Sequence, residues 1–239
     1  MLLFYIRHGD NTYTPDALTP LGERQAEALA KRLSLYGLNK IFTSTAKRTI
    51  LTAQPTCELL KIKPVELDWC HETKAWCQIA IPNEKGDDRI WPAHMEDFRQ
   101  QMASPELLMM GDNWHQHPMF ENTTCGEGVE RIRREADEFL AELGYRHVSG
   151  KGFYTVEKPN NERVALFAHQ GVGLVFLSCI MDIPYPTFCT HFDLGHSSMT
   201  VIEFKEHKGI AVPKILQLSN DSHLYRDGIL TGYENRIRF

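Results

Sequence analysis

Residues 2–10 of the chain read LLFYIRHGD, and this stretch decides how the rest of the sequence is interpreted. The apolar residues 2–6 are followed at once by Arg7, His8 and Gly9. An apolar run of that length, stopped by charge and glycine, is typical of a buried strand rather than of a helix. The segment therefore predicts a strand that delivers an arginine and a histidine to its carboxyl end.

Beyond this strand, the chain alternates between helices and strands. A Thr-Pro pair at residues 19–20 and Gly37 are typical of the start and the end of a helix, and apolar residues recur at helical spacing between them. Residues 41–43 predict a second brief strand, after which Ser44 or Thr45 is expected to cap a further helix. Strand, helix, strand and helix therefore follow one another.

Later segments continue the alternation. The sequence predicts an extended segment at 64–69, a helix from 129 to 143, a hairpin of strands 153–157 and 163–168 around a turn at 158–162, a helix at 172–181, and late strands at 198–204 and 214–218. Such alternation favours a largely parallel sheet with helices on both faces. We therefore expect a three-layer α/β/α sandwich, formed by residues 1–239 as one domain.

Composition restricts the class of protein. With 42% hydrophobic and 24% charged residues, the 239-residue chain is typical of a globular protein, not of disorder, collagen or a coiled coil. It has no apolar run near the roughly 18 to 20 residues of a membrane span. No basic leader precedes its first short apolar run. We expect a cytoplasmic protein that does not cross a membrane.

Charge and cysteine usage exclude further classes. The formal net charge of -5 argues against a surface that coats nucleic acid, which needs a broad basic face. The six cysteines contain no C-x-x-C pair, so neither a disulfide framework nor a zinc site is indicated. Any anionic ligand must therefore be held by a local cluster of cationic side chains.

Three predicted strand ends, at residues 7–9, 44–48 and 169–171, carry chemically capable groups. Ligands of open α/β sheets bind beyond the carboxyl ends of the strands, so these groups should converge. Arginine forks match phosphate oxygens, and Arg48 in the first turn of a helix adds a favourable dipole. A neutral His8 can attack phosphorus if its other ring nitrogen donates to a backbone carbonyl. The cluster predicts a phosphoryl pocket.

Each of these residues also has an ordinary structural interpretation. A lone Arg-His-Gly is a weak motif, and taken singly His8 or His169 is more often a buried or surface histidine without a catalytic function. Arg48 alone is usually a solvated helix residue. Their concentration at predicted strand ends nevertheless favours catalysis or anion binding.

Several stretches carry a family resemblance. They are Arg7–Gly9, Leu18–Ala26, Thr43–Ala53, Glu72, Phe167–Val172 and Asn220–Leu224. In order and spacing they resemble the histidine phosphatase superfamily, in its phosphoglycerate-mutase-like branch. The matching stretches bracket the whole chain, although residues 73–125 match no motif.

The resemblance implies a mechanism. His8 would attack a phosphate monoester in line and form a phosphohistidine, while Arg7, Arg48 and His169 hold the equatorial oxygens. Glu72 would protonate the departing oxygen and then take a proton from the water that attacks the phosphohistidine. The resemblance implies neither a metal nor a cofactor, and the expected partner is a small-molecule phosphate monoester.

The acid has alternatives. Glu72 matches the motif, but its ordinary interpretation is a surface carboxylate, and Glu66, Asp68 or Glu84 could fill the role instead. The Asn-Glu-Arg-His-Tyr-Gly run associated with the mutases is missing, because Glu72 is preceded by Cys-His and followed by Thr-Lys. Mutase activity on phosphoglycerate is therefore less favoured than hydrolysis.

Further phosphate contacts are expected from three residues. Gln170 lies in the stretch of the second histidine. Thr14 stands where the family commonly has an asparagine that contacts phosphate. Either the hydroxyl of Thr14 or the side chain of Asn11 could supply that contact.

Residues 73–125 are interpreted as an inserted cap segment. All four tryptophans lie between residues 69 and 114, together with four methionines. Since the segment follows the expected acid, it should fold over the strand ends and shape the leaving-group pocket. An equal alternative is the core of a small cap or of a homodimer contact. His94, His115 and His117 favour a metal site only weakly, because no partner carboxylate is evident.

The sequence thus predicts a metal-independent phosphomonoesterase that acts through a phosphohistidine on His8. A phosphoglycerate-mutase-type transferase is one alternative. A catalytically silent module that binds a phosphorylated ligand is another, disfavoured because every expected catalytic group is present.

Overall fold

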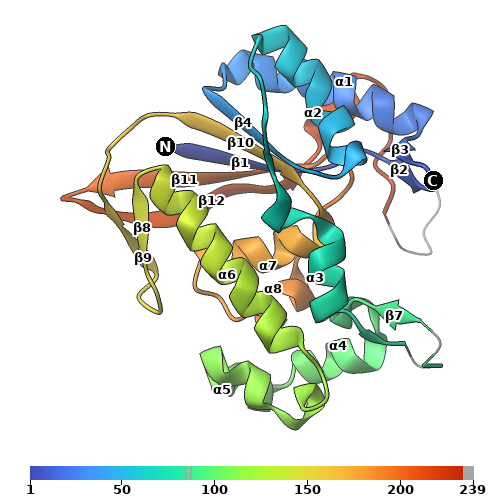
Figure 1. Ribbon diagram of the computed structural model, residues 1–239, viewed down its shortest axis with the longest axis vertical. Helices are drawn as coiled ribbons and strands as arrows, with labels where there is room; N and C mark the ends of the chain where they lie inside the picture. Colours follow the sequence, from blue (N-terminus) through green and yellow to red (C-terminus); the bar gives the residue numbers. More distant parts are fainter. Residues whose placement is uncertain (84, 87, 234–239) are drawn as a thin grey trace.

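An eight-stranded mixed sheet runs through the middle of the molecule (Figure 1). The computed structural model describes residues 1–83, 85–86 and 88–233. The strands of the sheet are β1 (Leu2–Arg7), β4 (Lys40–Ser44), β5 (Val65–Leu67), β8 (Tyr145–Val148), β9 (Phe153–Val156), β10 (Arg163–Ala168), β11 (Met199–His207) and β12 (Ile210–Asn220). Their order is β5-β4-β10-β1-β11-β12-β9-β8. The strands from β5 to β1 are parallel, and the remaining neighbours pair antiparallel.

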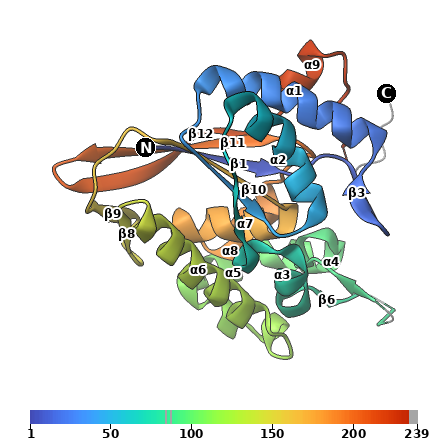
Figure 2. The ribbon, with the colours of Figure 1, turned by 45° about the horizontal axis from the view of Figure 1, so that its top comes forward.

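Helices cover both faces of the parallel part of the sheet. The helices of the described residues are α1 (Pro20–Tyr36), α2 (Lys47–Leu60), α3 (Glu72–Ile79), α4 (Glu96–Met102), α5 (Pro105–Met110), α6 (Cys125–Glu142), α7 (Gln170–Ile180), α8 (Tyr185–His191) and α9 (Ser222–Arg226). Helices α1 and α2 lie on one face, and α6 and α7 on the other (Figure 2). This arrangement confirms the predicted α/β/α sandwich.

The side chains of β1 alternate between the two faces of the sheet and pack against the helices on both sides. Phe4 and Ile6 belong to the cluster formed with α1 and α2, whereas Leu3 and Tyr5 belong to the larger cluster formed with α6 and α7. Successive side chains of a strand point to opposite faces of the sheet, so a strand buried on both faces is apolar throughout. This burial explains the unbroken apolar run at the start of the chain.

The first turn of α1 packs tightly against the loop that follows β1. Thr19 caps the helix, because its hydroxyl oxygen accepts a hydrogen bond of 3.1 Å from the Gly22 N–H. A Cβ atom at Gly22 would lie 1.9 Å from the carbonyl oxygen of Asp10, so only glycine fits here. Gly37 ends the helix with a φ of 65°. The predicted helix and both of its boundaries are confirmed.

Two local predictions are wrong. Strands 153–157 and 163–168 do not form a hairpin, because β9 pairs with β8 and β12, whereas β10 pairs with β1 and β4. Neither Ser44 nor Thr45 caps α2, whose N-cap is Ala46 without a side-chain hydrogen bond. A distant residue takes over the cap.

That residue is Asp16, in the short hairpin of β2 (Asn11–Tyr13) and β3 (Asp16–Leu18). One of its carboxylate oxygens accepts a hydrogen bond of 2.8 Å from the N–H of Lys47, the first residue of α2. A carboxylate at this position also complements the positive end of the helix dipole. The start of α2 is therefore fixed by a contact between segments 31 residues apart.

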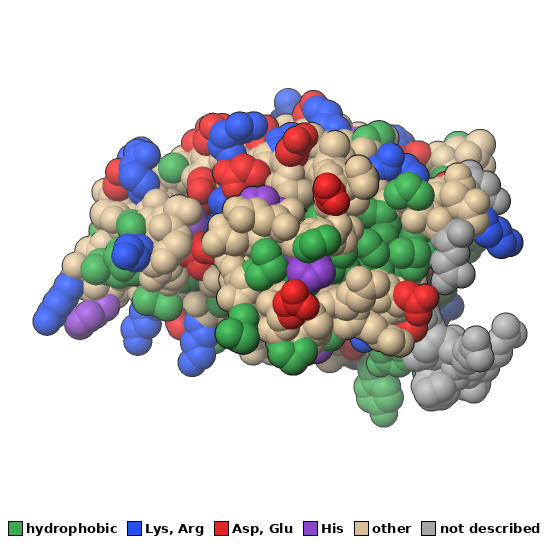
Figure 3. All heavy atoms as spheres, turned by 90° about the horizontal axis from the view of Figure 1, so that it is seen from below, with side chains coloured by type: hydrophobic (Ala, Val, Ile, Leu, Met, Phe, Trp, Pro, Cys, Tyr) green, Lys and Arg blue, Asp and Glu red, His purple; other side chains and the backbone are tan. Residues whose placement is uncertain are grey.

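The segment between α3 and α6 lies on the side of the sheet that α7 and α8 cover (Figure 1). Besides α4 and α5 it contains the strands β6 (Ile81–Pro82) and β7 (Arg89–Ile90) and the 3₁₀ turns Pro92–His94, Gly111–Gln116 and Pro118–Phe120. Viewed from this side, the described residues mix acidic, basic and hydrophobic side chains without a continuous basic area (Figure 3). In the described part of the chain, no helix is long and apolar enough to span a membrane.

Candidate active site

The two histidines of the sequence motifs lie side by side at the carboxyl ends of neighbouring strands. His8 follows β1 and His169 follows β10, and the His8 N–H donates to the carbonyl oxygen of Ala168 at 3.0 Å. The centroids of the two imidazole rings are 5.3 Å apart. Both side chains are at most 1% exposed. The parallel pairing of β1 with β10 therefore brings residues 161 positions apart into one buried cluster.

The ring of His8 has a fixed orientation. Its Nδ1 atom lies 2.8 Å from the carbonyl oxygen of Gly9. A carbonyl only accepts, so Nδ1 carries the proton and a neutral ring keeps the lone pair on Nε2. Burial, together with the nearby Arg7 and Arg48 cations, holds the pKa of His8 well below its ordinary value. The side chain is thus a buried, neutral imidazole with one nitrogen available for attack.

His169 has the opposite arrangement of its ring nitrogens. Its Nδ1 accepts a hydrogen bond of 3.1 Å from the Arg48 guanidinium, which has only donors. The proton therefore sits on Nε2, which donates to the Ser44 hydroxyl oxygen at 2.9 Å. Burial and the neighbouring His8 and Arg48 keep the pKa of His169 well below its ordinary value.

Arg48 is held between two carboxylates. It is the second residue of α2, it is 6% exposed, and its guanidinium donates to Asp16 at 3.1 Å. It also lies 3.5 Å from the carboxylate of Glu72. The ring of Tyr13 stacks over the guanidinium, with 5.3 Å from the ring centroid to the central carbon. Charged and aromatic neighbours therefore fix this arginine before a ligand binds.

Two neutral acceptors bind Arg7. Its guanidinium donates to the carbonyl oxygen of Leu194 at 2.6 Å and to Nε2 of His196 at 2.9 Å. The ring of His196 lies 5.5 Å from the ring of His8, centroid to centroid. Burial and the Arg7 cation lower the pKa of His196 to about 4, so it accepts as a neutral ring. Sequence reasoning missed both His196 and Asp16.

Glu72 joins the cluster from the first residue of α3. One carboxylate oxygen accepts a hydrogen bond of 2.9 Å from the Gly171 N–H. The other lies 3.5 Å from Nδ1 of His169 and 3.5 Å from Arg48. Burial raises the pKa of Glu72 above its ordinary value, although Arg48 and the Gly171 N–H oppose this shift. This shift extends the pH range over which Glu72 keeps its proton.

The alternative acids lie elsewhere. Glu66 is exposed on β5. The carboxylate of Asp68 is exposed and pairs with Lys74. Glu84 lies outside the described residues. Glu72 is therefore the carboxylate that the described structure places against His169.

The remaining predicted phosphate contacts are less central. Gln170 is 7% exposed, and its side-chain amide donates to the carboxylate of Asp193. Asn11 donates to the backbone carbonyl of Thr12 at 3.2 Å, and Thr14 is exposed in the turn between β2 and β3. Within the described residues, neither Asn11 nor Thr14 forms a hydrogen bond with the arginines or histidines of the cluster.

The cluster also has the residue types of a metal site. Potential ligand atoms of His8, Glu72 and His169 all lie within 4.8 Å of one another. The adjacent Arg7 and Arg48 cations disfavour a second cation and favour an anion. His94, His115 and His117 are not part of any such group among the described residues.

The segment after Glu72 covers one side of the cluster. A Cβ atom added to Gly171 would lie 2.2 Å from the ring of Trp91, so the indole packs directly on the backbone beside His169. The ring of Trp76 meets that of Trp91 edge-on, with centroids 5.3 Å apart. These contacts make two of the four tryptophans neighbours of the site.

Fold and site together define an α/β protein with two buried arginines beside the neutral imidazoles of His8, His169 and His196. Residues 3–214 match the family model described as histidine phosphatase superfamily (branch 1). The chain belongs to this family and is a phosphatase of it.

Curated relatives and solved structures agree with this assignment. The chain is 22% identical over 233 residues to phosphoserine phosphatase 1 of Hydrogenobacter thermophilus, with 93% of each chain covered. It is 23% identical over 230 residues to the "Probable phosphoglycerate mutase GpmB" of Yersinia enterocolitica, with 92% of this chain and 93% of that protein covered. Crystal structures of the phosphoserine phosphatase of Entamoeba histolytica, one a mutant with phosphoserine and one with 3-phosphoglyceric acid, share the fold. Both have a TM-score of 0.60 and cover 93% of this chain and 98% of theirs, at 17% and 16% identity.

Proposed function

We propose that this protein hydrolyses a phosphate monoester through a phosphohistidine on His8, with Glu72 acting first as an acid and then as a base. The observation that carries the proposal is the hydrogen bond between His8 Nδ1 and the Gly9 carbonyl. It leaves Nε2 as the nucleophile in a site where two arginines attract the phosphate. Relatives named as phosphoserine phosphatases support the same class of reaction.

In the first step, the Nε2 lone pair of His8 forms a bond to phosphorus as the bond to the alcohol oxygen breaks. Arg7 and Arg48 stabilise the charge on the equatorial oxygens. Glu72 gives its proton to the departing oxygen, which leaves as the alcohol. The raised pKa of Glu72 supports this role, because the acid must hold its proton until the bond breaks.

In the second step, the Glu72 carboxylate takes a proton from water while the water oxygen attacks phosphorus. The bond from phosphorus to Nε2 breaks, and its electron pair returns to the imidazole of His8. Inorganic phosphate leaves, and both residues recover their starting protonation states. One water is consumed for each alcohol and phosphate formed.

The test is the direct capture of the intermediate. Protein mixed with a ³²P-labelled monoester in EDTA and quenched within milliseconds should carry label on His8, labile in acid and stable in alkali, and EDTA should not reduce turnover. Hydrolysis without protein-bound label, or label on another residue, would reject the proposal. Turnover that depends on an added metal ion would reject its metal-independent form.

A further inference from the structure

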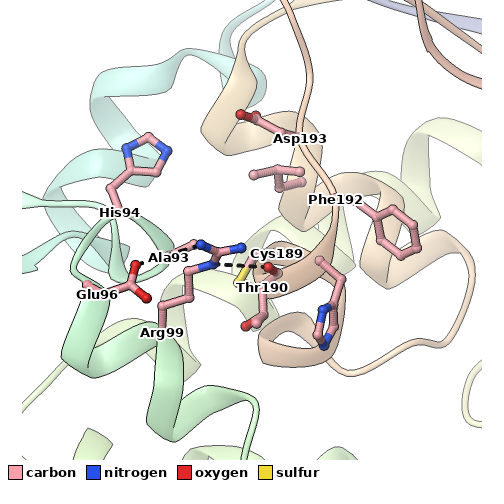
Figure 4. Close-up of a pocket in the computed structure, with 10 residues that line it drawn as sticks. Ala93, His94, Glu96, Arg99, Cys189, Thr190, Phe192 and Asp193 are labelled. Carbon is pink, nitrogen blue, oxygen red and sulfur yellow. Dashed lines mark hydrogen bonds and ion pairs between the residues drawn. The ribbon is translucent and has the colours of Figure 1, made fainter. Parts of the chain in front are cut away.

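A pocket near the candidate active site is bounded by three separate parts of the chain. Residues 93–99, residues 189–193 and Leu174 of α7 line it, and the volume is about 430 Å³ (Figure 4). Helix α4 packs against α8 below it. The space is large enough for a small organic group.

The pocket shares its wall with the phosphate site. Asp193 borders the pocket and accepts a hydrogen bond from the side chain of Gln170, the residue after His169. The next residue, Leu194, accepts the Arg7 guanidinium at 2.6 Å. Asp193 and Leu194 therefore connect the edge of the pocket to residues of the candidate active site.

The charges around the pocket are unequally compensated. Arg99 donates to the Thr190 carbonyl at 3.2 Å (Figure 4). It also lies 3.8 Å from Glu96, so the charges of Arg99 and Glu96 compensate each other. Asp193 accepts only neutral donors, the Gln170 amide and the N–H of Leu194 at 2.6 Å. No lysine or arginine among the described residues forms an ion pair with it. Two neutral donors therefore bind one carboxylate oxygen of Asp193, a residue that lines the pocket.

We propose that this pocket receives the alcohol part of the substrate and that Asp193 binds an ammonium group on it. This inference rests on the proposed function and names its substrate class: phosphate monoesters of amino-bearing alcohols. A carboxylate that is already oriented binds an ammonium group through a charge-assisted hydrogen bond, which is stronger than its bond to a hydroxyl. Asp193 would thus be a specificity-determining residue.

The test compares two achiral substrates that differ only at one group. O-phosphoethanolamine carries an ammonium group where 2-hydroxyethyl phosphate carries a hydroxyl. We expect kcat/KM for the ammonium substrate to exceed that for the hydroxyl substrate by about tenfold or more. Asp193→Asn keeps the acceptor for Gln170 but removes the charge, so the ratio of the two kcat/KM values should fall to about one.

Glu96→Gln is the matched control, because Glu96 lines the same pocket but faces Arg99. It should retain the preference. Equal kcat/KM values in the wild type, or a preference that survives in Asp193→Asn, would overturn the inference and leave the proposed function intact.

If the wild type hydrolysed no phosphate ester, the proposed function would fall. Calorimetric titration of the same two ligands into His8→Ala would then decide the pocket separately: tighter binding of the ammonium ligand, abolished by adding Asp193→Asn, supports the inference, and equal binding overturns it.

Discussion

His8 and His169 carry their ring protons on opposite nitrogens, Nδ1 in His8 and Nε2 in His169. His8 binds the Gly9 carbonyl through Nδ1 and leaves Nε2 available, whereas His169 binds Ser44 through Nε2 and directs Nδ1 toward Arg48 and Glu72. The two imidazoles are therefore not interchangeable. One is arranged to attack, and the other is tied into the charged network around the acid.

The first prediction concerns this nucleophile. His8→Ala should lower kcat for 4-nitrophenyl phosphate by about a thousandfold or more, because no other neutral imidazole in the cluster has its ring fixed with Nε2 available. The measurement is steady-state hydrolysis, with circular dichroism to check folding. His207→Ala, which alters an exposed histidine at the end of β11, should leave kcat unchanged. Near-normal turnover in His8→Ala would remove His8 from the mechanism.

The second prediction concerns the acid. Glu72→Gln keeps an acceptor for the Gly171 N–H but has no proton to give, so it should slow hydrolysis far more for an alkyl phosphate than for 4-nitrophenyl phosphate, whose leaving group needs no proton. We expect a difference of about a hundredfold between the two losses. Glu66→Gln, on an exposed residue of β5, is the control. Equal losses on both substrates would assign the proton to another group.

The third prediction is a pH profile. The pKa of His8 is held well below its ordinary value, so the nucleophile stays neutral into acid solution, and the raised pKa of Glu72 keeps that residue protonated above its ordinary range. Activity that needs neutral His8 and protonated Glu72 should therefore be highest on the acid side of neutrality. The ratio of kcat/KM for the wild type to that for Glu72→Gln, measured with the same alkyl phosphate, cancels the ionisation of the substrate. This ratio should fall as pH rises through the pKa of Glu72, and a flat ratio would contradict the assignment.

Much of the fold follows from local patterns. β1 is apolar at every position because both of its faces are buried, and α1 carries its own cap at Thr19 and its own end at Gly37. The partners of β9 could not be predicted in this way. A strand can pair with any of several strands that are distant in sequence. The turn residues at 158–162 are compatible with a connection in any direction, so they do not indicate the partner of β9.

The residues of the candidate site also fall into those that local sequence patterns predict and those that they do not. His8 and His169 could be predicted because each directly follows a parallel strand, and such strands end at one edge of the sheet. His196 precedes β11, which runs antiparallel to β1, so its amino end lies at that same edge. A sequence pattern that revealed the direction of β11 would have found it. Asp16 contacts Lys47 and Arg48 in the first turn of α2, and only tertiary packing brings the hairpin that carries it near that helix.

The fourth prediction concerns His196 as the acceptor that positions Arg7. His196→Ala should lower kcat/KM by roughly ten- to a hundredfold, mainly through KM, because a hydrogen bond to a buried guanidinium is lost. His196→Asn supplies an amide oxygen and should restore most of the activity. In the wild type, protonation of His196 near its pKa of about 4 removes this acceptor and places a second positive charge beside Arg7. The ring of His8 and the carboxylates of Asp10 and Asp193 also lie near this charge. His196→Asn should therefore resist acid better than the wild type, and an identical acid limb would refute this role.

The last prediction concerns stability away from the site. The buried ring of His147 on β8 lies between two carboxylates, with Nδ1 2.8 Å from Asp137 of α6 and Nε2 3.2 Å from Asp182. Arg133 and the Gly152 N–H also bind Asp182, at 3.3 Å and 2.8 Å. Burial lowers the pKa of His147, but the two carboxylates outweigh it and raise the pKa above its ordinary value. The ring is thus favoured in its charged form, with both nitrogens donating.

A raised pKa in the folded state stabilises the protein below the ordinary histidine pKa, and this stabilisation is lost as pH rises through the folded value. His147→Gln should therefore reduce the free energy of unfolding by about 3 kcal/mol at pH 6, because it breaks a buried charged network, and by clearly less at pH 9. Urea unfolding of wild type and variant at both pH values measures this double difference, in which the titrations of the active site cancel. His207→Gln should change neither value. A loss for His147→Gln that is equal at the two pH values would show that His147 is neutral in the fold and that its two carboxylates do not hold a proton on both ring nitrogens.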